Sequence, residues 1–421
     1  MKEKIKSTGL QRGMYVVELD KPWLGSPFLF QGFLLEDEDT IQQLIDYCDY
    51  VYIDHEKSDD SPMNFGNKSA DTTGTFKSLG NDIIKNRKYQ IDVEEELPTA
   101  KDIRRKSKES TIRMFNDVRM GKSLDVQAVK ETVNEIVESI TRNPDAMMLL
   151  STIKDKDEYS VVHAFNVSAM SVIFGRYLGM DRELLEELGM GAMLHDVGET
   201  RIPQEILNKK GLLTAEEQEL VQSHTRHGMD ILSTTRDIPQ SAIDIAYTHH
   251  ERCNSSGYPR NLPSADIPLL AKVVAIIDVY DAVTTSRYHK HGISSTDALK
   301  TMYDWRDRLF DGELIEKFIQ CLGIYPVGSV VELNSGEVGI VFSVPPENRL
   351  LPKILLVRDA NKQPYMPPKI IQLSQFKEED QSAKYEITKV LESNSYGIDL
   401  KKYLLRDLQV EQIGSRKSVR S

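Results

Sequence analysis

Apolar residues follow several different spacings along this chain of 421 residues. In the first 56 residues, the segments GMYVVEL and YVYID cluster β-forming residues, as short strands do. The segment EDTIQQLIDYC between them places Ile41, Leu44 and Ile45 at helical spacing. We therefore expect a small α+β domain over residues 1–56.

Residues 57–98 break this pattern. They begin with KSDDSPMNFGNKSADTTGTFKSLG, which is rich in Ser, Asp, Asn and Gly and has few apolar positions. A segment of this composition buries too little apolar surface to offset the entropy lost on ordering. We expect a flexible linker here.

From residue 99 to residue 323 the apolar positions follow the helical period, for example in VQAVKETVNEIVESI. Asp125 precedes that segment as an N-cap, and Thr214 and Glu217 have the spacing of a capping box. Three prolines stand where a first-turn proline would start a helix: Pro203, Pro239 and Pro268. The pattern predicts connecting helices over 99–140 and a helical bundle over 141–323.

The last part of the chain, 324–421, changes period again. VGSVVELNSGEVGIVFSV indicates two strands around an Asn-Ser-Gly turn, and PKILLVRDANKQPY indicates another hairpin. We expect a small C-terminal β module with a polar tail. The predicted fold class is therefore mainly α, a helical bundle flanked by an N-terminal α+β domain and a C-terminal β module.

Composition narrows the choice of function. The apolar fraction is 40% and the charged fraction 28%, as in soluble globular proteins, and no uninterrupted apolar run is long enough to span a membrane. The N-terminus lacks the apolar stretch of a secretory signal, and the three cysteines are widely spaced, which favours reduced thiols in the cytoplasm. A net charge of −12 argues against broad nucleic-acid binding but allows a small phosphorylated ligand.

Histidines gather in the helical region: of nine, all except His55 lie between residues 163 and 291. One of them, His195, is followed directly by Asp196 in MLHDVGETRIP at the end of an apolar segment. The simplest interpretation is a capped helix end, with Val197 as its last residue and Gly198 in the left-handed conformation.

Other acidic and imidazole groups lie at comparable positions. We expect His163 on a helix, His224 on the helix capped by Thr214, and His249–His250 at the end of a further helix. Asp278 interrupts the apolar segment LLAKVVAIIDVYDAV, where an unpaired carboxylate would be costly.

Each of these positions also has a plain structural explanation. A single histidine on an apolar face is usually a hydrogen-bonded core residue. His249–His250 beside Glu251 could be a solvated helix end, and Asp278 could pair with Lys272.

Taken together, five histidines and two aspartates at the ends or inner faces of consecutive helices favour a metal site in a bundle. Imidazole and carboxylate ligands suit iron, manganese or zinc. They are too many for one ion, and suit two ions that share a carboxylate. Such a pair can hold a hydroxide and clamp a phosphoryl oxygen.

From about Tyr159 to Gly323 the chain resembles the HD-GYP family of HD-type hydrolases. The HD pair is His195–Asp196, and the GYP motif is Gly257–Tyr258–Pro259 in HHERCNSSGYPRNL. The segment GMYVVELDKPWLGSPFLFQGF also resembles an uncharacterised domain that commonly precedes HD-GYP domains.

The resemblance implies a phosphodiesterase that opens cyclic di-GMP to pGpG, and further to GMP, through a metal-bridging hydroxide. It implies two divalent ions, Fe or Mn, and signalling partners such as GGDEF-type proteins. The ligands it implies are His163, His195, Asp196, His224, His249, His250 and Asp278. Asp196 would bridge the metals. Asp196 and Glu199 are the candidate catalytic residues.

Three further residues are implied in substrate binding. Arg287 and Lys290 match basic residues that contact the substrate phosphate, although both could be surface charges after a helix end. Tyr258 either lines the ligand pocket or supports the tight turn of the GYP loop.

The chain departs from the family pattern at three positions. Glu199 replaces the usual Lys of HDxGK, where it could repel the phosphate, pair with Arg201 or Arg287, or lie outside the site. Asn254 replaces an aspartate before the GYP motif, and Tyr159 stands where members with a third metal carry Glu. The first two departures leave open a second hypothesis, a degenerate module that binds the nucleotide or partner proteins without turnover. A third hypothesis is hydrolysis of a different phosphoester.

Overall fold

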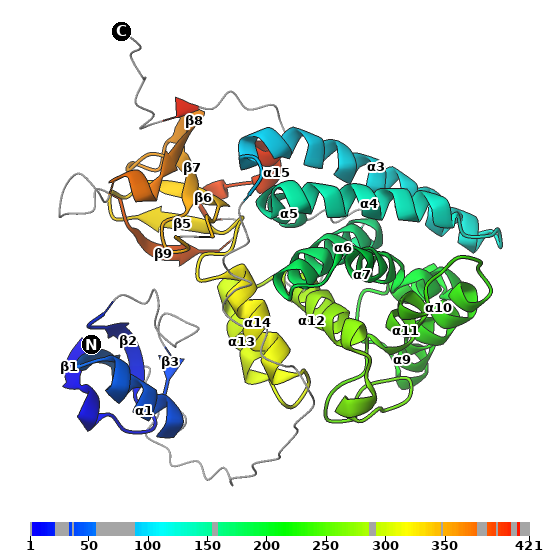
Figure 1. The fold of residues 1–421 in the computed structure, drawn as a ribbon, viewed down its shortest axis with the longest axis horizontal. Helices are drawn as coiled ribbons and strands as arrows, with labels where there is room; N and C mark the ends of the chain where they lie inside the picture. The colour runs from blue at the N-terminus through cyan, green and yellow to red at the C-terminus, as the bar shows by residue number, and fades with distance from the viewer. Residues whose placement is uncertain are drawn as a thin grey trace. The chain divides into compact units, whose positions relative to one another are not determined.

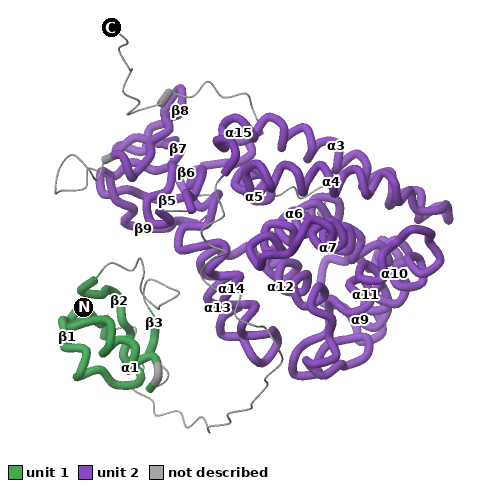
Figure 2. The backbone as a smooth tube through the Cα atoms, viewed as in Figure 1, with its two compact units in different colours: residues 1–81 green, residues 82–421 purple. Residues whose placement is uncertain are grey.

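The computed structural model of the chain describes residues 2–21, 33–35, 38–55, 89–153, 159–285, 292–346, 348–376, 385–392, 395–405 and 411–412. The chain divides into two compact units, residues 1–81 and 82–421 (Figure 2). Each is described by itself.

In its described residues the first unit is a four-stranded antiparallel sheet with one α-helix, which confirms the predicted α+β fold. Its strand order is β1-β4-β2-β3. The core includes Leu44 of the helix and Val51 and Ile53 of the sheet, all fully buried. The elements are β1 (Lys2–Lys6), a 3₁₀ turn (Ser7–Gly9), β2 (Tyr15–Leu19), β3 (Phe33–Leu34), α1 (Glu38–Tyr47) and β4 (Tyr50–Asp54).

The helical part of the second unit begins earlier than expected. Helix α3 starts at Val93 with three acidic residues in its first turn, where the helix dipole favours them. The last residues of the expected linker 57–98 are therefore helical, while residues 56–88 lie outside the described residues. The α-helices of this part are α3 (Val93–Arg119), α4 (Val126–Arg142), α5 (Pro144–Ser151), α6 (Tyr159–Tyr177), α7 (Arg182–Leu194), α8 (Gln204–Leu207), α9 (Ala215–Gln222), α10 (His224–Ser233), α11 (Gln240–Thr248), α12 (Leu269–Thr284), α13 (Ser295–Asp304) and α14 (Gly312–Leu322), with 3₁₀ turns at Val197–Arg201 (η2) and Ser264–Asp266 (η3).

The predicted helix starts are confirmed. The Asp125 carboxylate accepts the Ala128 amide, and Thr214 and Glu217 form a reciprocal capping box. Each of the three prolines stands one residue before a helix: Pro203, Pro239 and Pro268. Helices α3 and α4 run side by side (Figure 1), joined by the buried Glu96, which accepts from Arg142 Nε at 2.6 Å.

Two nearly all-apolar helices, α6 and α12, form the centre of the bundle. Helices that are apolar on every side must be surrounded by protein. Helix α6 accordingly contacts α4, α5, α7 and α12. These two helices also carry His163 and Asp278, so both polar groups are placed in the interior, 4% and 8% exposed.

The C-terminal region forms a six-stranded sheet in the order β10-β8-β7-β6-β5-β9, antiparallel except for the short β10. The predicted hairpins are confirmed as β5–β6 and β7–β8. The elements are β5 (Val330–Leu333), β6 (Val338–Ser343), β7 (Lys353–Arg358), β8 (Pro364–Gln372), a 3₁₀ turn (Leu373–Phe376), β9 (Ile387–Leu391), a 3₁₀ turn (Ser395–Gly397), α15 (Leu400–Leu404) and β10 (Glu411–Gln412).

The sheet is tied to the bundle. The Asp145 carboxylate at the start of α5 accepts from Ser343 Oγ at 2.6 Å and from the Val344 amide at 2.9 Å. The expected boundary near residue 323 is therefore a change of secondary structure within one compact unit. No helix in the described part of the chain has the length and apolar character needed to cross a membrane.

Candidate metal centre

Helix ends bring most of the predicted ligands together. His195 follows the last residue of α7, His249 follows α11, and Asp278 and His163 project from α12 and α6. His224 was expected on the capped helix, but that helix (α9) ends at Gln222, and His224 is the first residue of α10.

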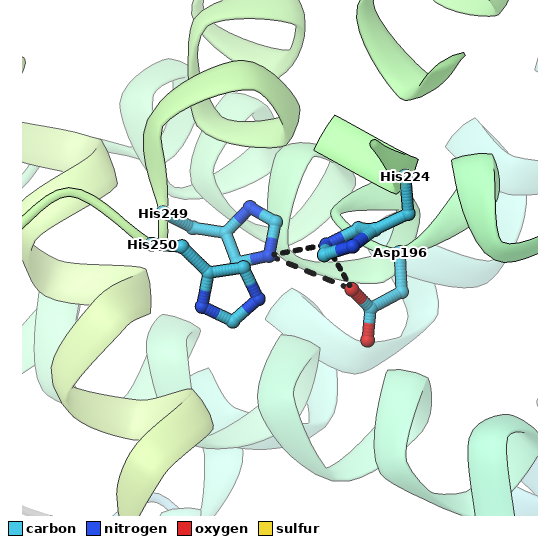
Figure 3. A group of neighbouring side chains, drawn as sticks. All are labelled: Asp196, His224, His249 and His250. Carbon is cyan, nitrogen blue, oxygen red and sulfur yellow. Dashed lines mark hydrogen bonds and ion pairs between the residues drawn. The ribbon is translucent and has the colours of Figure 1, made fainter. Parts of the chain in front are cut away.

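Asp196 stands between two groups of imidazoles. Within each group, the potential ligand atoms all lie within 4.8 Å of one another; the groups are Asp196, His224, His249 and His250, and His163, His195 and Asp196. In the first group, the Nε2 atoms of His224 and His249 lie 3.4 and 3.5 Å from Asp196 Oδ1 (Figure 3).

The other carboxylate oxygen faces the second group. Asp196 Oδ2 lies 3.0 Å from His195 Nε2 and 3.9 Å from His163 Nε2. Asp278 Oδ1 is 3.1 Å from the same His163 nitrogen, so Asp278 joins this side of the centre. Lys272 pairs with Asp311 at 3.2 Å, which rules out the predicted alternative of a Lys272–Asp278 pair.

Helix carbonyls fix the orientation of the imidazoles. The Nδ1 atoms of His195 and His224 lie 2.7 Å from the carbonyl oxygens three residues earlier, and His249 Nδ1 lies 3.0 Å from the Ile245 carbonyl. A carbonyl only accepts, so each Nδ1 carries a proton, and Nε2 is the nitrogen left to bind a metal. The Nε2 atoms of all three rings lie 3.0 to 3.5 Å from Asp196, the arrangement that metal-binding histidines require.

His163 is held by a carboxylate that the sequence analysis did not assign. Its Nδ1 donates to Asp281 Oδ2 at 2.7 Å, and Asn166 donates to Asp281 Oδ1 at 3.0 Å. Asp281 lies three residues after Asp278 on an apolar helix, and positions three apart share a face. That spacing was the signal that could have identified it.

The donor set fits divalent metal ions. His195 Nε2 is buried and lies 3.0 Å from Asp196 Oδ2 in a geometry that forms no hydrogen bond, a costly arrangement unless a further group binds it. Burial acts to raise the pKa of Asp196, but the surrounding imidazoles, His195 first, hold it well below its usual range. Burial and the neighbouring His249 lower the pKa of His250 far below its usual range, so that ring is neutral, the form that binds metal.

The glycine of the HD motif has a packing role. Gly198 does not take the left-handed conformation expected of a helix cap; it lies in the turn η2. A Cβ atom on Gly198 would stand 1.9 Å from the His224 carbonyl oxygen and 2.5 Å from the Gly228 nitrogen. Only glycine lets η2 approach α10, which begins with the predicted ligand His224.

The GYP loop folds back over the histidine pair. A Cβ atom on Gly257 would lie 2.4 Å from the His250 carbonyl oxygen, and the Tyr258 ring centroid is 4.6 Å from that of His250. Glu251 is buried and accepts from the Arg260 and Leu262 amides at 2.7 and 2.9 Å. The pair is therefore not a solvated helix end, and Glu251 is a second residue that the sequence analysis did not assign.

The two substitutions in the family pattern have different surroundings. Glu199 Oε2 accepts from Ser160 Oγ at 3.2 Å, and burial followed by the charge of Asp196 raises the pKa of Glu199 to about 7. Of the alternatives for Glu199, pairing with Arg201 is not formed; Arg201 lies 4.0 Å from Asp230 instead. Asn254 is exposed and accepts from Ser256 Oγ at 2.6 Å, within its own loop.

For three residues singled out in the sequence, the structure describes no side chain. Arg287 and Lys290 lie outside the described residues, and so does the side chain of Tyr159.

Comparison with known proteins agrees with this geometry. An HD domain matches residues 147–314, and a domain of unknown function (DUF3391) matches residues 2–129. A cyclic di-GMP phosphodiesterase of Pseudomonas aeruginosa is 32% identical over 388 residues, which cover 92% of each chain. Two others, from Thermotoga maritima and Xanthomonas campestris, are 34% and 32% identical over 42% and 46% of this chain and about half of their own.

A helical bundle with imidazole and carboxylate ligands at its helix ends defines an HD-domain hydrolase. The chain belongs to the HD-GYP family of HD-domain phosphodiesterases, in the form that carries the DUF3391 domain at its N-terminus. That domain extends past the expected boundary at residue 56 and includes α3.

Proposed function

We propose that the protein is a metal-dependent phosphodiesterase that hydrolyses cyclic di-GMP to pGpG and further to GMP. The observation that carries this proposal is the position of Asp196 between two groups of predicted ligands. The relatives support the choice of substrate, since a protein similar over nine-tenths of this chain is named for cyclic di-GMP hydrolysis.

The ligands would hold two divalent ions, Fe or Mn, that share the Asp196 carboxylate. One side would use His224, His249 and His250, and the other His163, His195 and Asp278. When bound, such ions supply a hydroxide nucleophile at neutral pH and positive charge for the phosphoryl oxygens.

The protein's own residues prepare the site. The Nδ1 hydrogen bonds of His195, His224 and His249 hold the imidazoles in one tautomer and one orientation, so binding does not have to order them. Tyr258, packed on His250, forms an aromatic wall against which a base or ribose can lie. Arg287 and Lys290 remain our candidates for holding the phosphate, and GGDEF-type partners and a cytoplasmic location stay predictions.

Glu199 favours a second hypothesis, a module that binds cyclic di-GMP or a partner without turnover. It places a carboxylate beside Asp196 where relatives in the family have a lysine. A negative charge there opposes the approach of an anionic phosphodiester.

Turnover decides between the two hypotheses. Purified protein loaded anaerobically with Mn(II) or Fe(II) is incubated with cyclic di-GMP, and the products are separated by chromatography. We expect pGpG from the wild-type protein, none from His195→Ala, and normal turnover from His227→Ala, a matched histidine outside the ligand set. Intact substrate together with tight binding of cyclic di-GMP would establish the second hypothesis.

A substrate panel tests the remaining alternative. Two relatives from Vibrio cholerae are named as phosphodiesterases of 3′3′-cGAMP, so that nucleotide is the first competitor to compare. A higher kcat/KM for 3′3′-cGAMP than for cyclic di-GMP would contradict the proposed substrate.

A further inference from the structure

A cavity of about 150 Å³ lies where the helical bundle meets the C-terminal sheet. Its walls come from α5, α6 and α14, from the segment before β5 and from the segment after β6; Figure 1 shows where these elements lie. Much of its surface is apolar, contributed by Met148, Ile173, Leu322, Val327 and Val344. None of the predicted metal ligands lines it, and the nearest one along α6, His163, is ten residues or about 15 Å from Ile173.

Two arginines also line this cavity, and helix carbonyls hold both. Arg349 donates to the carbonyl oxygens of Gln320 and Cys321 at the end of α14. Arg176 donates through Nη1 to the Ile140 carbonyl at 2.8 Å, near the end of α4. Each guanidinium is thereby fixed in place, which reduces the entropy lost when it binds an anion.

The acidic residue in the same wall, Asp145, already accepts hydrogen bonds from neighbouring groups. Asp145 accepts from Ser343, the Val344 amide and the Tyr89 hydroxyl, the last at 3.1 Å. Among the residues that the structure describes, Arg349 forms no ion pair with this or any other carboxylate. The carbonyls take two of the five N–H groups of its guanidinium.

The cavity is partly open to solvent, and Arg176 and Arg349 in its lining are half-buried. Its volume has room for roughly ten water molecules. It combines apolar walls with a few fixed polar groups at one side, the usual composition of a small-molecule site.

We propose that this cavity binds a small amphipathic carboxylate, with its charged end on Arg349 and Arg176 and its apolar tail between Met148, Ile173 and Val327. The volume accommodates a ligand of about ten non-hydrogen atoms. Octanoate has that size, and octanamide is its uncharged counterpart with the same number of non-hydrogen atoms.

Calorimetric titration of the metal-loaded, full-length protein tests the site. We expect octanoate to bind about tenfold or more tightly than octanamide, because a charged pair with Arg349 is lost in the amide. Arg349→Gln should weaken octanoate binding by a similar factor, and Arg182→Gln, an exposed arginine on α7, should leave it unchanged. Val327→Phe, which fills the cavity, should abolish binding while circular dichroism shows a folded chain.

Two further titrations define the site and the headgroup. Affinity should rise from butanoate to octanoate and then stop rising at dodecanoate, where the tail exceeds the cavity. Neither saturating cyclic di-GMP nor removal of the metals should change the affinity for octanoate. Hexyl phosphate measures whether a phosphate serves as well as a carboxylate, and a phosphate that binds more tightly would overturn the choice of carboxylate.

Any of three results would overturn the site itself. These are equal affinities for octanoate and octanamide, unchanged binding to Val327→Phe, and loss of binding when the metals are removed. The last would show that the carboxylate sits on the metal centre.

Discussion

Gly198 and His224 touch through their backbones: a side chain on Gly198 would overlap the His224 carbonyl oxygen, at 1.9 Å. This contact links the turn after the HD pair to the first residue of α10. The position of His224, a predicted ligand, thus depends on the absence of a side chain at Gly198, two residues after the predicted ligand Asp196. The glycine of the HD motif therefore serves the metal centre without contacting a metal.

We predict that Gly198→Ala destabilises the protein by about 2 kcal/mol or more, because the backbone of α10 must move away. The displaced His224 should also lower the bound metal. Gly228→Ala is the matched control: its Cβ would meet nothing closer than 3.5 Å, so α10 gains a better helix former without a clash. Thermal unfolding and metal analysis of both variants check this. Equal behaviour of the two would show that the contact is not needed.

The two ligand groups around Asp196 predict different metal contents for different variants. His250→Ala should leave about one ion per chain, since the His163 side keeps its ligands, and His163→Ala should do the same from the other side. Asp196→Asn should lose most of both metal ions, because Asp196 belongs to each ligand group. Elemental analysis of protein purified without oxygen measures this. A single-metal centre would be indicated if the wild-type protein held one ion and each of the three substitutions removed it.

A substitution at Asp281 should lower the affinity for metal without changing the number of ions that the site can hold. Asp281→Asn removes the negative charge that His163 Nδ1 meets at 2.7 Å, and loss of such partners typically weakens metal binding by roughly 10- to 100-fold. Competition with a chelator gives the affinity directly, independent of turnover. Asp266→Asn, an exposed aspartate on the same unit, should bind metal like the wild-type protein. If both variants do so, Asp281 only packs the helix.

Sequence signals sufficed where the interaction is local. The caps at Asp125 and Thr214 depend on residues three positions apart, so the pattern alone located those helix starts. The start of α10 could not be found this way. TAEEQELVQSHTRHG has no Gly or Pro between the two helices, and α10 packs on η2, which lies more than twenty residues earlier.

The site shows the same division. The predicted ligands that the structure brings together were marked in the sequence by His and Asp at helix ends and by the resemblance. Glu251 was not marked in this way, because its role appears only when the amides of the GYP loop are placed beside it. Asp281 shares a helix face with Asp278, but the sequence did not show that His163 lies against it. Strand β1 was missed for a related reason: KEKIK is an edge strand whose exposed charges hide its pairing with β4.

Glu199 predicts a change in substrate affinity. Glu199→Lys should lower the KM for cyclic di-GMP about tenfold, because a cation would replace the anion next to the phosphate position. Glu199→Gln keeps the shape of the side chain and removes only its charge, so its KM should lie between those of the wild-type protein and Glu199→Lys. Steady-state kinetics of the three proteins at equal metal content measure these KM values. Loss of kcat in both variants would show instead that the Glu199 carboxylate takes part in proton transfer or metal binding.

The last prediction concerns pH and the buried Asp145. Burial raises the pKa of this carboxyl above its usual value, and its hydrogen bonds from Ser343 and Val344 offset only part of the shift. The folded state therefore holds the proton more tightly than the unfolded state, whose pKa is about 3.9. The resulting stability is fully present below that pH and is lost as the pH rises through the folded pKa.

Asp145→Asn cannot ionise, so it lacks this dependence. The free energy of unfolding of the wild-type protein, measured relative to Asp145→Asn, should fall as the pH rises above about 4 and then level off. Asp102→Asn is a control of opposite sign: hydrogen bonds from Arg105 and Lys106 lower the pKa of Asp102, so the wild-type advantage there should grow with pH, by a small amount because the group is exposed. Urea titrations across the pH series compare the slopes. A wild-type advantage over Asp145→Asn that grows with pH would mean that the hydrogen bonds to the ionised carboxylate outweigh its burial.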